Sequence, residues 1–348
     1  MKEKWEIQNQ IRKTRMAIKN KRKVTVVGAT TWGIALALTL AKNNCDVFLL
    51  TRNELETKDI LKSKRIKRFI NNISLPLNLI IDHNIDVIES STIVVIAVPS
   101  SAFRQNLERI KRCISDKVII VSGTKGLEEN TSNRMSQIFN EILPKTTDRF
   151  CVLSGPNLAK EVFDRIPTTT ILASTSVRTA KTVKSFFHSE VFYVFWDDDI
   201  VGVELGGSLK NIIVLAVGIC DGLNYGDNIK SAIITMGLNE IQELAIKLGA
   251  KRKTIFGLSG LGDLTATAAS GFSRNRFAGE MLGKGKNIST VLNDMDNVVE
   301  GIQTAKEAKR LADSVGLRLP IINAVNEILV NNLSSNKFLQ KIFEENLE

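Results

Sequence analysis

Two lysines occur in sequence contexts where a free surface lysine is not expected. Lys210 stands in the segment GGSLKN, inside a glycine-rich and apolar stretch with helical spacing. Lys125 comes shortly after the apolar run Val118–Val121, between Thr124 and Gly126. An enclosed ammonium is costly to bury, so it usually has a partner or a function. Such a lysine can stabilise an anion or exchange a proton, whereas the alternative for Lys125 is an ordinary surface-turn lysine.

Polar residues in the second half of the chain could complete a site of this kind. Asp263 lies in the segment GLGDL, where the flanking glycines favour an exposed turn and a capping aspartate as the ordinary interpretation. Ser273, Arg274 and Asn275 form a short polar run that could equally be a solvated loop. Cations and donors that converge are typical of a site for a phosphate dianion. A carboxylate close to Lys210 would raise the pKa of that lysine, and a second cation would lower it.

A glycine-containing turn lies between the β-branched run Val24–Val27 and an apolar segment that begins at Ile34. Gly28 permits the tight turn, and Gly33 lets the following helix pack close to the strand. The helix N-terminus then offers backbone N–H groups to a pyrophosphate. Thr30 replaces the middle glycine of Gly-x-Gly-x-x-Gly, and its side chain would crowd the phosphates unless the loop shifts or the hydroxyl points outward. The place of this turn after the first strand favours cofactor binding over a purely structural turn.

The end of the second predicted strand bears on the choice of cofactor. NAD-specific sites usually have an Asp or Glu there for the ribose hydroxyls. This chain has Arg52, whose guanidinium could pair with a 2′-phosphate and stack on adenine. Arg52 therefore favours NADPH, although Glu54 and Glu56 leave NAD open and a plain surface arginine is the alternative.

Short β-branched runs alternate with helix-spaced segments from Lys23 to about Phe195. This alternation predicts a Rossmann-type α/β domain with a mostly parallel sheet and helices on both faces. Two predicted helix faces are Phe103, Leu107 and Ile110, and Ala180, Val183 and Phe187. The candidate strands are Val24–Val27, Val47–Leu50, Thr92–Val98, Val118–Val121, Val152–Leu153, Thr169–Ala173 and Val191–Phe195.

The pattern changes near Asp197-Asp198-Asp199. From Ile200 onward the apolar residues have helical spacing, and Pro320 is the only proline after Pro167. An all-α C-terminal domain is therefore expected. We place a dinucleotide-binding domain at 23–199, a helical substrate-binding domain at 200–348 and a basic N-terminal extension at 1–22. A chain of 348 residues suits two domains.

Charge and composition exclude several classes of protein. Residues 1–23 hold nine Lys/Arg and two Glu, a net +7 of the total +10, so only +3 remains for the other 325 residues. This distribution argues against a nucleic-acid partner. No charge-free stretch approaches the roughly 20 residues of a membrane span. Four scattered cysteines and two isolated histidines predict neither structural zinc nor another metal site.

Nine segments, in this order and approximate spacing, resemble the NAD(P)-dependent glycerol-3-phosphate dehydrogenases of the soluble bacterial type. The resemblance runs from about Lys23 to the end of the chain. The segments are GATTWG (28–33), AVPSSAFR (97–104), TKGLE (124–128), LSGPNLAKEV (153–162), VELGGSLKN (203–211), CDGLNYGDN (220–228), GLGDL (260–264), SRNR (273–276) and VVEGIQTA (298–305).

The resemblance implies a cytoplasmic oxidoreductase that interconverts dihydroxyacetone phosphate and sn-glycerol 3-phosphate by hydride transfer with NAD(P)H. It would supply glycerol 3-phosphate for phospholipid synthesis. The expected partner is a phosphorylated small molecule, and a homodimer is allowed for.

The matching positions assign a role to each site residue. Lys210 is implied as the proton donor and acceptor. Substrate binding is implied for Lys125, Gly155, Asn157, Asn211, Asp263, Ser273, Arg274 and Asn275. Cofactor binding is implied for Gly28, Thr31, Trp32, Gly33, Arg52, Lys125, Ala159, Arg274, Val298 and Glu300. Asn157 departs from the pattern, since the family usually has serine after Gly-Pro.

Two alternatives remain at this stage. A related two-domain reductase of another small hydroxy acid would share the fold and a lysine, but SRNR and TKGLE favour a phosphorylated substrate. A non-catalytic nucleotide-sensing protein could keep the fold alone. The joint presence of the lysines, Asp263, Arg274 and Asn275 argues against it.

The substitution Lys210→Ala should abolish most turnover and leave NADPH binding nearly intact. The reason is that only the proton-transfer group is removed. Turnover can be followed by the absorbance of NADPH, and NADPH binding can be titrated separately. Turnover that persists within about tenfold, a barrier change of roughly 1.4 kcal/mol, would assign proton transfer to another residue.

Overall fold

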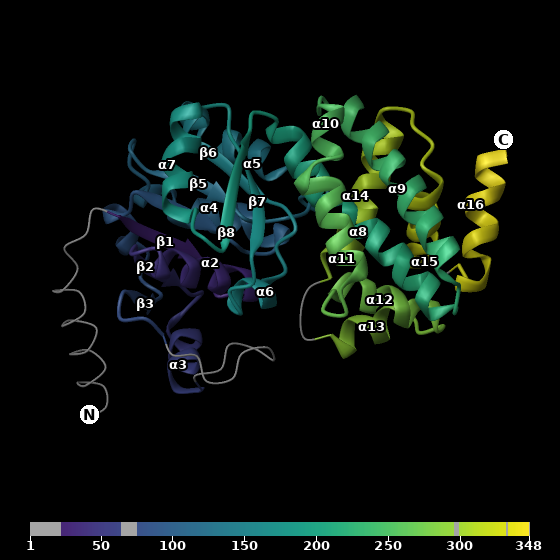
Figure 1. Cartoon of the computed structure of the whole chain (residues 1–348), viewed down its shortest axis with the longest axis horizontal. Coiled ribbons are helices and arrows are strands. Elements are labelled where there is room, and N and C mark those ends of the chain that lie inside the picture. Colours follow the sequence, from purple (N-terminus) through teal and green to yellow (C-terminus); the bar gives the residue numbers. More distant parts are fainter. Residues whose placement is uncertain (1–21, 64–74, 296–298, 332, 348) are drawn as a thin grey trace.

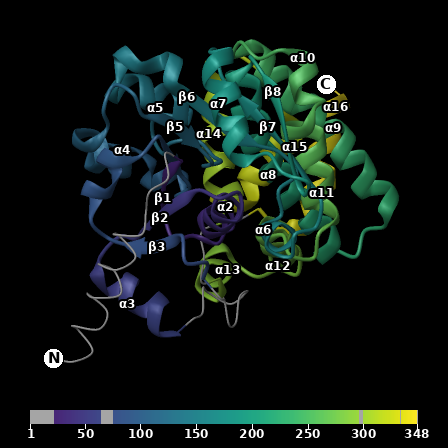
Figure 2. The same ribbon diagram turned by 60° about the vertical axis from the view of Figure 1, so that its left-hand side comes forward.

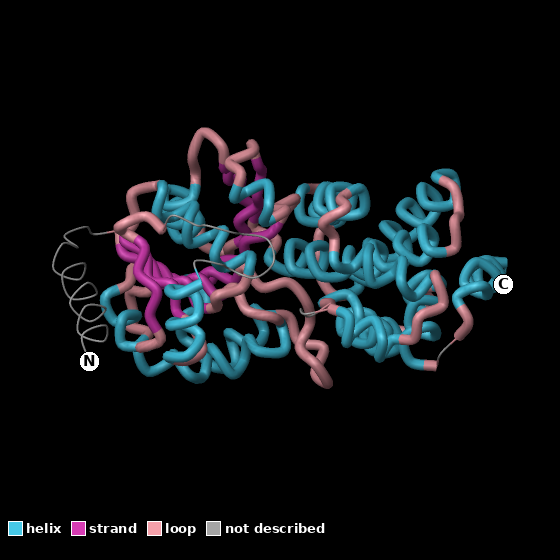
Figure 3. The backbone as a smooth tube through the Cα atoms, turned by 90° about the horizontal axis from the view of Figure 1, so that it is seen from below, coloured by secondary structure: helices cyan, strands magenta, loops and turns pink. Residues whose placement is uncertain are grey.

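The computed structural model describes residues 22–63, 75–295, 299–331 and 333–347. The predicted N-terminal extension, apart from Arg22, lies outside the described residues, as does Val298. Figure 1 shows an α/β domain and a helical domain side by side. Seen along the perpendicular direction, all strands lie in one half of the molecule and the other half is helical (Figure 3).

The α/β domain is built on one eight-stranded sheet with the order β3-β2-β1-β4-β5-β6-β7-β8. Strands β1 to β6 are parallel, β7 is antiparallel to β6, and β8 is parallel to β7. The order 3-2-1-4-5-6 is that of the Rossmann fold. The strands are β1 (Lys23–Val27), β2 (Asp46–Leu50), β3 (Leu79–Asp82), β4 (Ile93–Ile96), β5 (Ile119–Ser122), β6 (Phe150–Ser154), β7 (Thr168–Ala173) and β8 (Phe192–Asp197).

The seven predicted strands are all present, each within two residues of its predicted ends. The eighth strand, β3, is absent from the prediction. Its apolar run, Leu79–Ile81, is only three residues long and lies between Asn78 and Asp82, so it carries little strand signal. It becomes a strand because it pairs with β2, register Val47 with Leu79.

Helices cover both faces of the sheet, as the alternation predicts (Figures 1 and 2). The two predicted helix faces are confirmed. Phe103, Leu107 and Ile110 of α4 are buried against one face, and Ala180, Val183 and Phe187 of α7 are buried against the other. The α-helices of this domain are α2 (Thr31–Lys42), α3 (Glu54–Ser63), α4 (Phe103–Ile110), α5 (Met135–Ile142), α6 (Ala159–Phe163) and α7 (Val177–Phe187).

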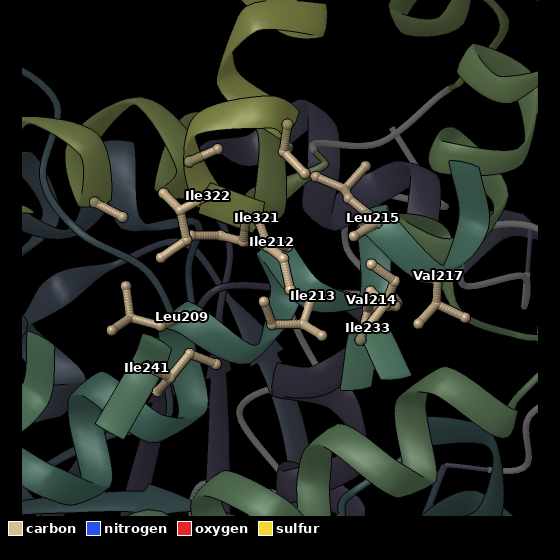
Figure 4. Packing of buried hydrophobic residues seen from close by; sticks show 14 of the residues in the cluster. Leu209, Ile212, Ile213, Val214, Leu215, Val217, Ile233, Ile241, Ile321 and Ile322 are labelled. Atoms are coloured by element: carbon tan, nitrogen blue, oxygen red, sulfur yellow. The ribbon is translucent and has the colours of Figure 1, made fainter. Parts of the chain in front are cut away.

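The helical domain is arranged around α8 (Ile200–Gly222), in which every residue from Gly202 to Cys220 is buried. Figure 4 shows side chains of α8 packing with those of α9 and α15. The remaining helices are α9 (Asp227–Lys247), α10 (Arg252–Ile255), the π-helical turn η6 (Leu258–Gly262), α11 (Asp263–Ala269), α12 (Arg274–Gly283), α13 (Ile288–Asp294), α14 (Glu300–Ser314), α15 (Pro320–Val330) and α16 (Phe338–Leu347).

By length and hydropathy, α8 could cross a membrane, but 89% of its most apolar window is buried inside the protein. It is therefore the core helix of the helical domain and not a membrane span. Its burial on all sides explains why it is apolar all round and not on one stripe.

Glycines allow α12 to lie directly against α8. A Cβ added at Gly279 of α12 would come within 2.1 Å of the Leu215 carbonyl oxygen, and one added at Gly218 of α8 would come within 2.1 Å of the Arg276 carbonyl oxygen. One turn further along, Gly222 and Gly283 make the same close approach. This contact fixes the start of α12, where Arg274 and Asn275 are located, relative to α8.

The substitution Gly279→Ala should destabilise the protein by about 1–3 kcal/mol, because a methyl group would be forced into backbone atoms. That cost exceeds the gain of up to ~1 kcal/mol in helix propensity. Chemical denaturation measures the difference. Gly271→Ala is the control, since no atom lies within 4 Å of its added Cβ. Equal stability of the two variants would contradict this account of the packing.

Candidate active site

A cleft of about 480 Å³ lies between the two domains at the carboxyl ends of β1, β2, β4 and β5. Ligands bind at this edge in open α/β sheets. Gly28, Arg52, Val98 and Lys125 line it from the α/β domain, at or shortly beyond the ends of those strands. The predicted site residues that line it are Gly28, Thr31, Trp32, Arg52, Lys125, Asn157, Ala159, Lys210, Asn211, Asp263, Ser273, Arg274, Asn275 and Glu300.

Of the predicted site residues that the structure describes, two do not line this cleft. Gly33 is buried, and a Cβ there would come within 2.1 Å of the Gly28 carbonyl oxygen, which agrees with its expected packing role. Gly155 has a φ of +134°, which favours glycine, and its carbonyl oxygen accepts a hydrogen bond of 3.2 Å from Lys125 Nζ. Gly155 therefore contributes through its backbone to the placement of Lys125.

Asp263 joins the two lysines at the base of the cleft. Its Oδ1 accepts a hydrogen bond of 2.9 Å from Lys210 Nζ, and its Oδ2 accepts one of 2.6 Å from Lys125 Nζ. Lys210 is 4% exposed and Asp263 is 2% exposed, so the pair is removed from water. Lys125 comes from the α/β domain and the other two residues come from the helical domain, so the cluster spans the boundary.

The ordinary interpretation of Asp263 as an exposed capping residue is wrong. The turn η6 packs its glycines against α8, so that a Cβ at Gly206 would lie 3.2 Å from the Gly260 backbone. The glycines permit this close approach of two backbones and do not mark a solvent-exposed turn. Asp263 is buried as a result.

Thr267 is a site residue that the sequence analysis missed. Lys210 Nζ donates to Thr267 Oγ1 at 2.5 Å, and Thr267 Oγ1 lies 2.6 Å from the carbonyl oxygen of Asp263. Its spacing of four residues from Asp263 on one helix is the signal that could have identified it.

The polar run at the start of α12 is ordered by backbone contacts. Ser273 is the N-cap of α12, and its Oγ accepts a hydrogen bond from Arg276 N. Asn275 Oδ1 accepts from Gly301 N at 3.0 Å, which ties α12 to the start of α14 beside Glu300. Arg274 therefore lies at a fixed helix start that lines the cleft. The run is therefore a helix start and not a loop, although Arg274 itself is exposed.

At the other end of the cleft, the turn after β1 accommodates Thr30 without directing its hydroxyl into the cleft. Thr30 is the N-cap of α2: its Oγ1 accepts from Gly33 N at 3.0 Å and donates to the Ala97 carbonyl oxygen at 2.7 Å. Gly28 has a φ of +109°, and a Cβ there would come within 2.7 Å of Val98. The Thr30 hydroxyl therefore forms its hydrogen bonds within the protein and points away from the space for the phosphates, which is one of the two arrangements expected for a threonine at this position.

The chain matches known proteins over nearly its whole length. Residues 23–180 match the profile of the NAD-dependent glycerol-3-phosphate dehydrogenase N-terminus, and residues 199–340 match that of its C-terminus. The glycerol-3-phosphate dehydrogenase [NAD(P)+] of Carboxydothermus hydrogenoformans is 42% identical over 312 residues, which cover 89% of this chain and 93% of that protein. The chain belongs to this family.

Solved structures agree with this assignment. The glycerol-3-phosphate dehydrogenase of Coxiella burnetii has a TM-score of 0.88 at 34% identity, with 93% of this chain and 99% of that chain covered. A ketopantoate reductase from Ralstonia eutropha has a TM-score of 0.55 at 11% identity over 91% of this chain and 99% of that chain, a likeness of fold alone. The enzyme is therefore a glycerol-3-phosphate dehydrogenase [NAD(P)+] that interconverts dihydroxyacetone phosphate and glycerol 3-phosphate, and the two alternative functions are set aside.

The residues at the glycine turn of the dehydrogenase fit a dinucleotide. The first turn of α2 and the side chain of Trp32 line the cleft. The indole Nε1–H of Trp32 is buried and has no partner among the described residues. A buried donor without a partner is costly. An acceptor on a ligand in the cleft would satisfy it.

Arg52 and Asn157 are present in the cleft of the dehydrogenase but are already engaged. The Arg52 guanidinium donates to Glu56 Oε1 at 2.9 Å, and its side chain is 79% exposed. Asn157 Nδ2 donates to the Thr169 carbonyl oxygen at 2.7 Å, and its Oδ1 accepts from Thr170 at 3.0 Å. The side chain of Asn157, which is larger than serine, is thus held against β7 by two hydrogen bonds. One hydrogen of its amide group remains to donate to a ligand.

Burial sets the pKa of the central lysine of the dehydrogenase. Loss of water lowers the pKa of Lys210 to about 8, with Asp263 opposing this shift and Lys125 adding to it. The expected opposition of these two neighbours is present, but burial is the larger cause. Burial alone would raise the pKa of Asp263, yet the two lysines together hold it below its ordinary value. Burial raises the pKa of Glu300, and Arg274 opposes this.

If Lys210 supplies the proton, the kcat/KM for ketone reduction should fall as the pH rises through about 8, because the ammonium that donates the proton is then lost. For alcohol oxidation it should rise over the same range. In Asp263→Asn the influence that raises the pKa of Lys210 is lost, so both limbs should move to lower pH. The measurement is the pH profile of residual turnover in both directions. Limbs that stay in place, or move to higher pH, would contradict this assignment.

Proposed function

We propose that Lys210 is the proton donor and acceptor of this dehydrogenase, and that Lys125 and Asp263 hold and tune it. The single observation that carries this proposal is the shared carboxylate of Asp263, which receives one ammonium from each domain at 2.6 and 2.9 Å. The chemistry that a bound nicotinamide supplies is hydride transfer to or from the substrate carbon.

The protonated Lys210 is suited to the charge that develops on the ketone oxygen. An ammonium close to that oxygen stabilises the negative charge and then donates the proton. Its pKa of about 8 supports action in both directions, since neither protonation state is rare near neutral pH. Thr267 and Asp263 direct the ammonium, because each accepts a hydrogen bond from Nζ.

The positive charge at the start of α12 is suited to the substrate phosphate. Arg274 and Asn275 line the cleft, and the N-terminus of α12 adds a favourable dipole. The same reasoning supports substrate contacts for Lys125, Asn211 and Ser273, and for the remaining amide hydrogen of Asn157. Glu300, beside Arg274, is proposed to contact the cofactor from the helical domain.

We infer a preference for NADPH from Arg52. Its guanidinium lines the cleft and is exposed, so it can leave Glu56 for a 2′-phosphate at little cost. Glu56 would favour the other cofactor. NAD has a ribose 2′-hydroxyl where NADP has a 2′-phosphate, and the Glu56 carboxylate could accept a hydrogen bond from that hydroxyl.

We propose that the enzyme acts in the cytoplasm, in the direction that supplies glycerol 3-phosphate for phospholipid synthesis, and that it requires no metal ion. We also propose domain limits of 23–199 and 200–348, because β8 ends at Asp197 and α8 begins at Ile200. A homodimer is compatible with this arrangement.

Oxidation of NADPH and of NADH with dihydroxyacetone phosphate, followed by absorbance in wild type and in Arg52→Ala, tests this proposal. Wild type should prefer NADPH, and Arg52→Ala should lose most of that preference through a higher KM for NADPH. Lys58→Ala, which removes an exposed charge of helix α3 outside the cleft lining, is the matched control. An unchanged preference in Arg52→Ala removes this role from Arg52. Equal efficiency with an unphosphorylated hydroxy-ketone would contradict the phosphate site.

A further inference from the structure

The loop from Gly123 to Arg134 carries Lys125 out of β5 and into the cleft. Three of its residues have a φ in the left-handed region: Gly126 at +122°, Asn130 at +68° and Ser132 at +58°. For residues other than glycine this conformation costs free energy and persists only where surrounding contacts hold it. The contacts that hold this loop therefore determine where Lys125 lies.

A buried carboxylate of α14 bonds to both strained non-glycine residues. Glu307 is 2% exposed. Its Oε1 accepts from Asn130 N at 3.2 Å, and its Oε2 accepts from Ser132 Oγ at 2.7 Å. The helical domain thus stabilises the strained part of a loop that belongs to the α/β domain.

A second buried carboxylate, on α8, bonds to the end of the loop and the start of α5. Glu204 accepts from Arg134 Nη1 at 2.7 Å, from Ser136 N at 2.7 Å and from Ser136 Oγ at 2.5 Å. Next to Lys125 itself, Gly126 N donates to Ser208 Oγ of α8 at 2.8 Å. Both carboxylates have their oxygens occupied, as buried charges require.

Each carboxylate stands on a helix that also supplies a residue of the cleft. Glu204 precedes Lys210 by six residues on α8, about 9 Å along the axis, and Glu307 follows Glu300 by seven residues on α14, about 10 Å. Because helices are rigid, the position of the anchored loop is fixed relative to Lys210 on α8 and Glu300 on α14.

The α/β domain also contributes contacts to this loop. Arg104 of α4 pairs with Glu128 at 2.6 and 2.9 Å and with Glu141 at 2.6 Å. The Arg104 side chain is 37% exposed, and exposed pairs contribute little. The start of the loop is also held by the sheet, because Thr124 Oγ1 donates to the Val98 carbonyl oxygen at 2.9 Å. The helical domain therefore holds chiefly the later part of the loop, from Asn130 to Arg134.

We propose that Glu204 and Glu307 are positioning residues for the reaction: they anchor the Lys125 loop to α8 and α14, so that Lys125 meets Asp263 opposite Lys210. The proposal rests on the roles given above to Lys125 and Lys210. Buried ion pairs are weak evidence for stability but can specify one arrangement among several. The arrangement specified here is the placement of a lysine across a domain boundary.

The test compares Glu307→Ala with Glu240→Ala. Glu240 is a matched control: it is a buried carboxylate of the same domain that joins α9 to α15, since it accepts from Ile321 N and Ile322 N. Glu307→Ala should lower kcat/KM for dihydroxyacetone phosphate by roughly 10–100-fold, since a displacement of about 1 Å can cost that much. Glu240→Ala, assayed where it is folded, should stay within about twofold of wild type.

The pH profile separates positioning from a general loss of stability. When Lys125 moves away, it no longer lowers the pKa of Lys210, so the reduction limb should shift to higher pH in Glu307→Ala. Lys125→Met should shift it the same way, and Glu240→Ala should not shift it. Glu307→Gln, which keeps the shape and one acceptor, should recover part of the activity and of the shift.

Loop-side variants keep the proposal testable if Glu307→Ala does not fold. Ser132→Ala removes one hydrogen-bond partner of Glu307 and should lower kcat/KM by a smaller factor than Glu307→Ala. Glu204→Gln weakens the anchor on α8 and should also lower kcat/KM. If these variants are folded and match Glu240→Ala in both kcat/KM and pH profile, the positioning proposal is overturned. If Lys125→Met itself retains wild-type kinetics, the proposed role of Lys125 fails instead.

Discussion

The carboxylate of Asp263 lies between two ammonium groups, one from each domain, and almost no water reaches it. Two positive charges this close would repel each other in a medium of low dielectric constant, and one carboxylate between them removes most of that cost. Removal of one partner from a buried ionic cluster typically costs about 3–5 kcal/mol. The contact between the domains at the cleft and the protonation of Lys210 both depend in part on this arrangement.

The helical domain stabilises this charged cluster by surrounding it with closely packed, rigid backbone. The core helix α8 is buried along its length, so Lys210 cannot turn toward solvent without disrupting its packing. Glycines let η6 and α12 approach α8 at backbone distance. These contacts bring Asp263 and Arg274 to the same end of the cleft. Low pKa and fixed geometry at Lys210 thus have one origin, which is the close packing around a single helix.

Two departures from the family pattern are absorbed by local hydrogen bonds. Thr30 lines the cleft, but its hydroxyl caps α2 and donates to the Ala97 carbonyl oxygen just after β4. Asn157 uses both ends of its amide on β7. In each case the side chain that departs from the family pattern hydrogen-bonds to neighbouring backbone or side-chain atoms.

The sequence by itself determined the fold class, seven of the eight strands, the glycine turn and many of the residues that line the cleft, because period, turn chemistry and motif order are local properties. It could not determine that Asp263 is buried, since the glycines around it equally suit an exposed turn. It missed β3, which exists only through its partner strand, and Thr267, which matters only beside Lys210. Only the tertiary structure decided the pKa of Lys210 and the anchoring of the Lys125 loop by Glu204 and Glu307. Both depend on residues separated by 50 or more positions, whose contact and burial arise from packing between helices and domains.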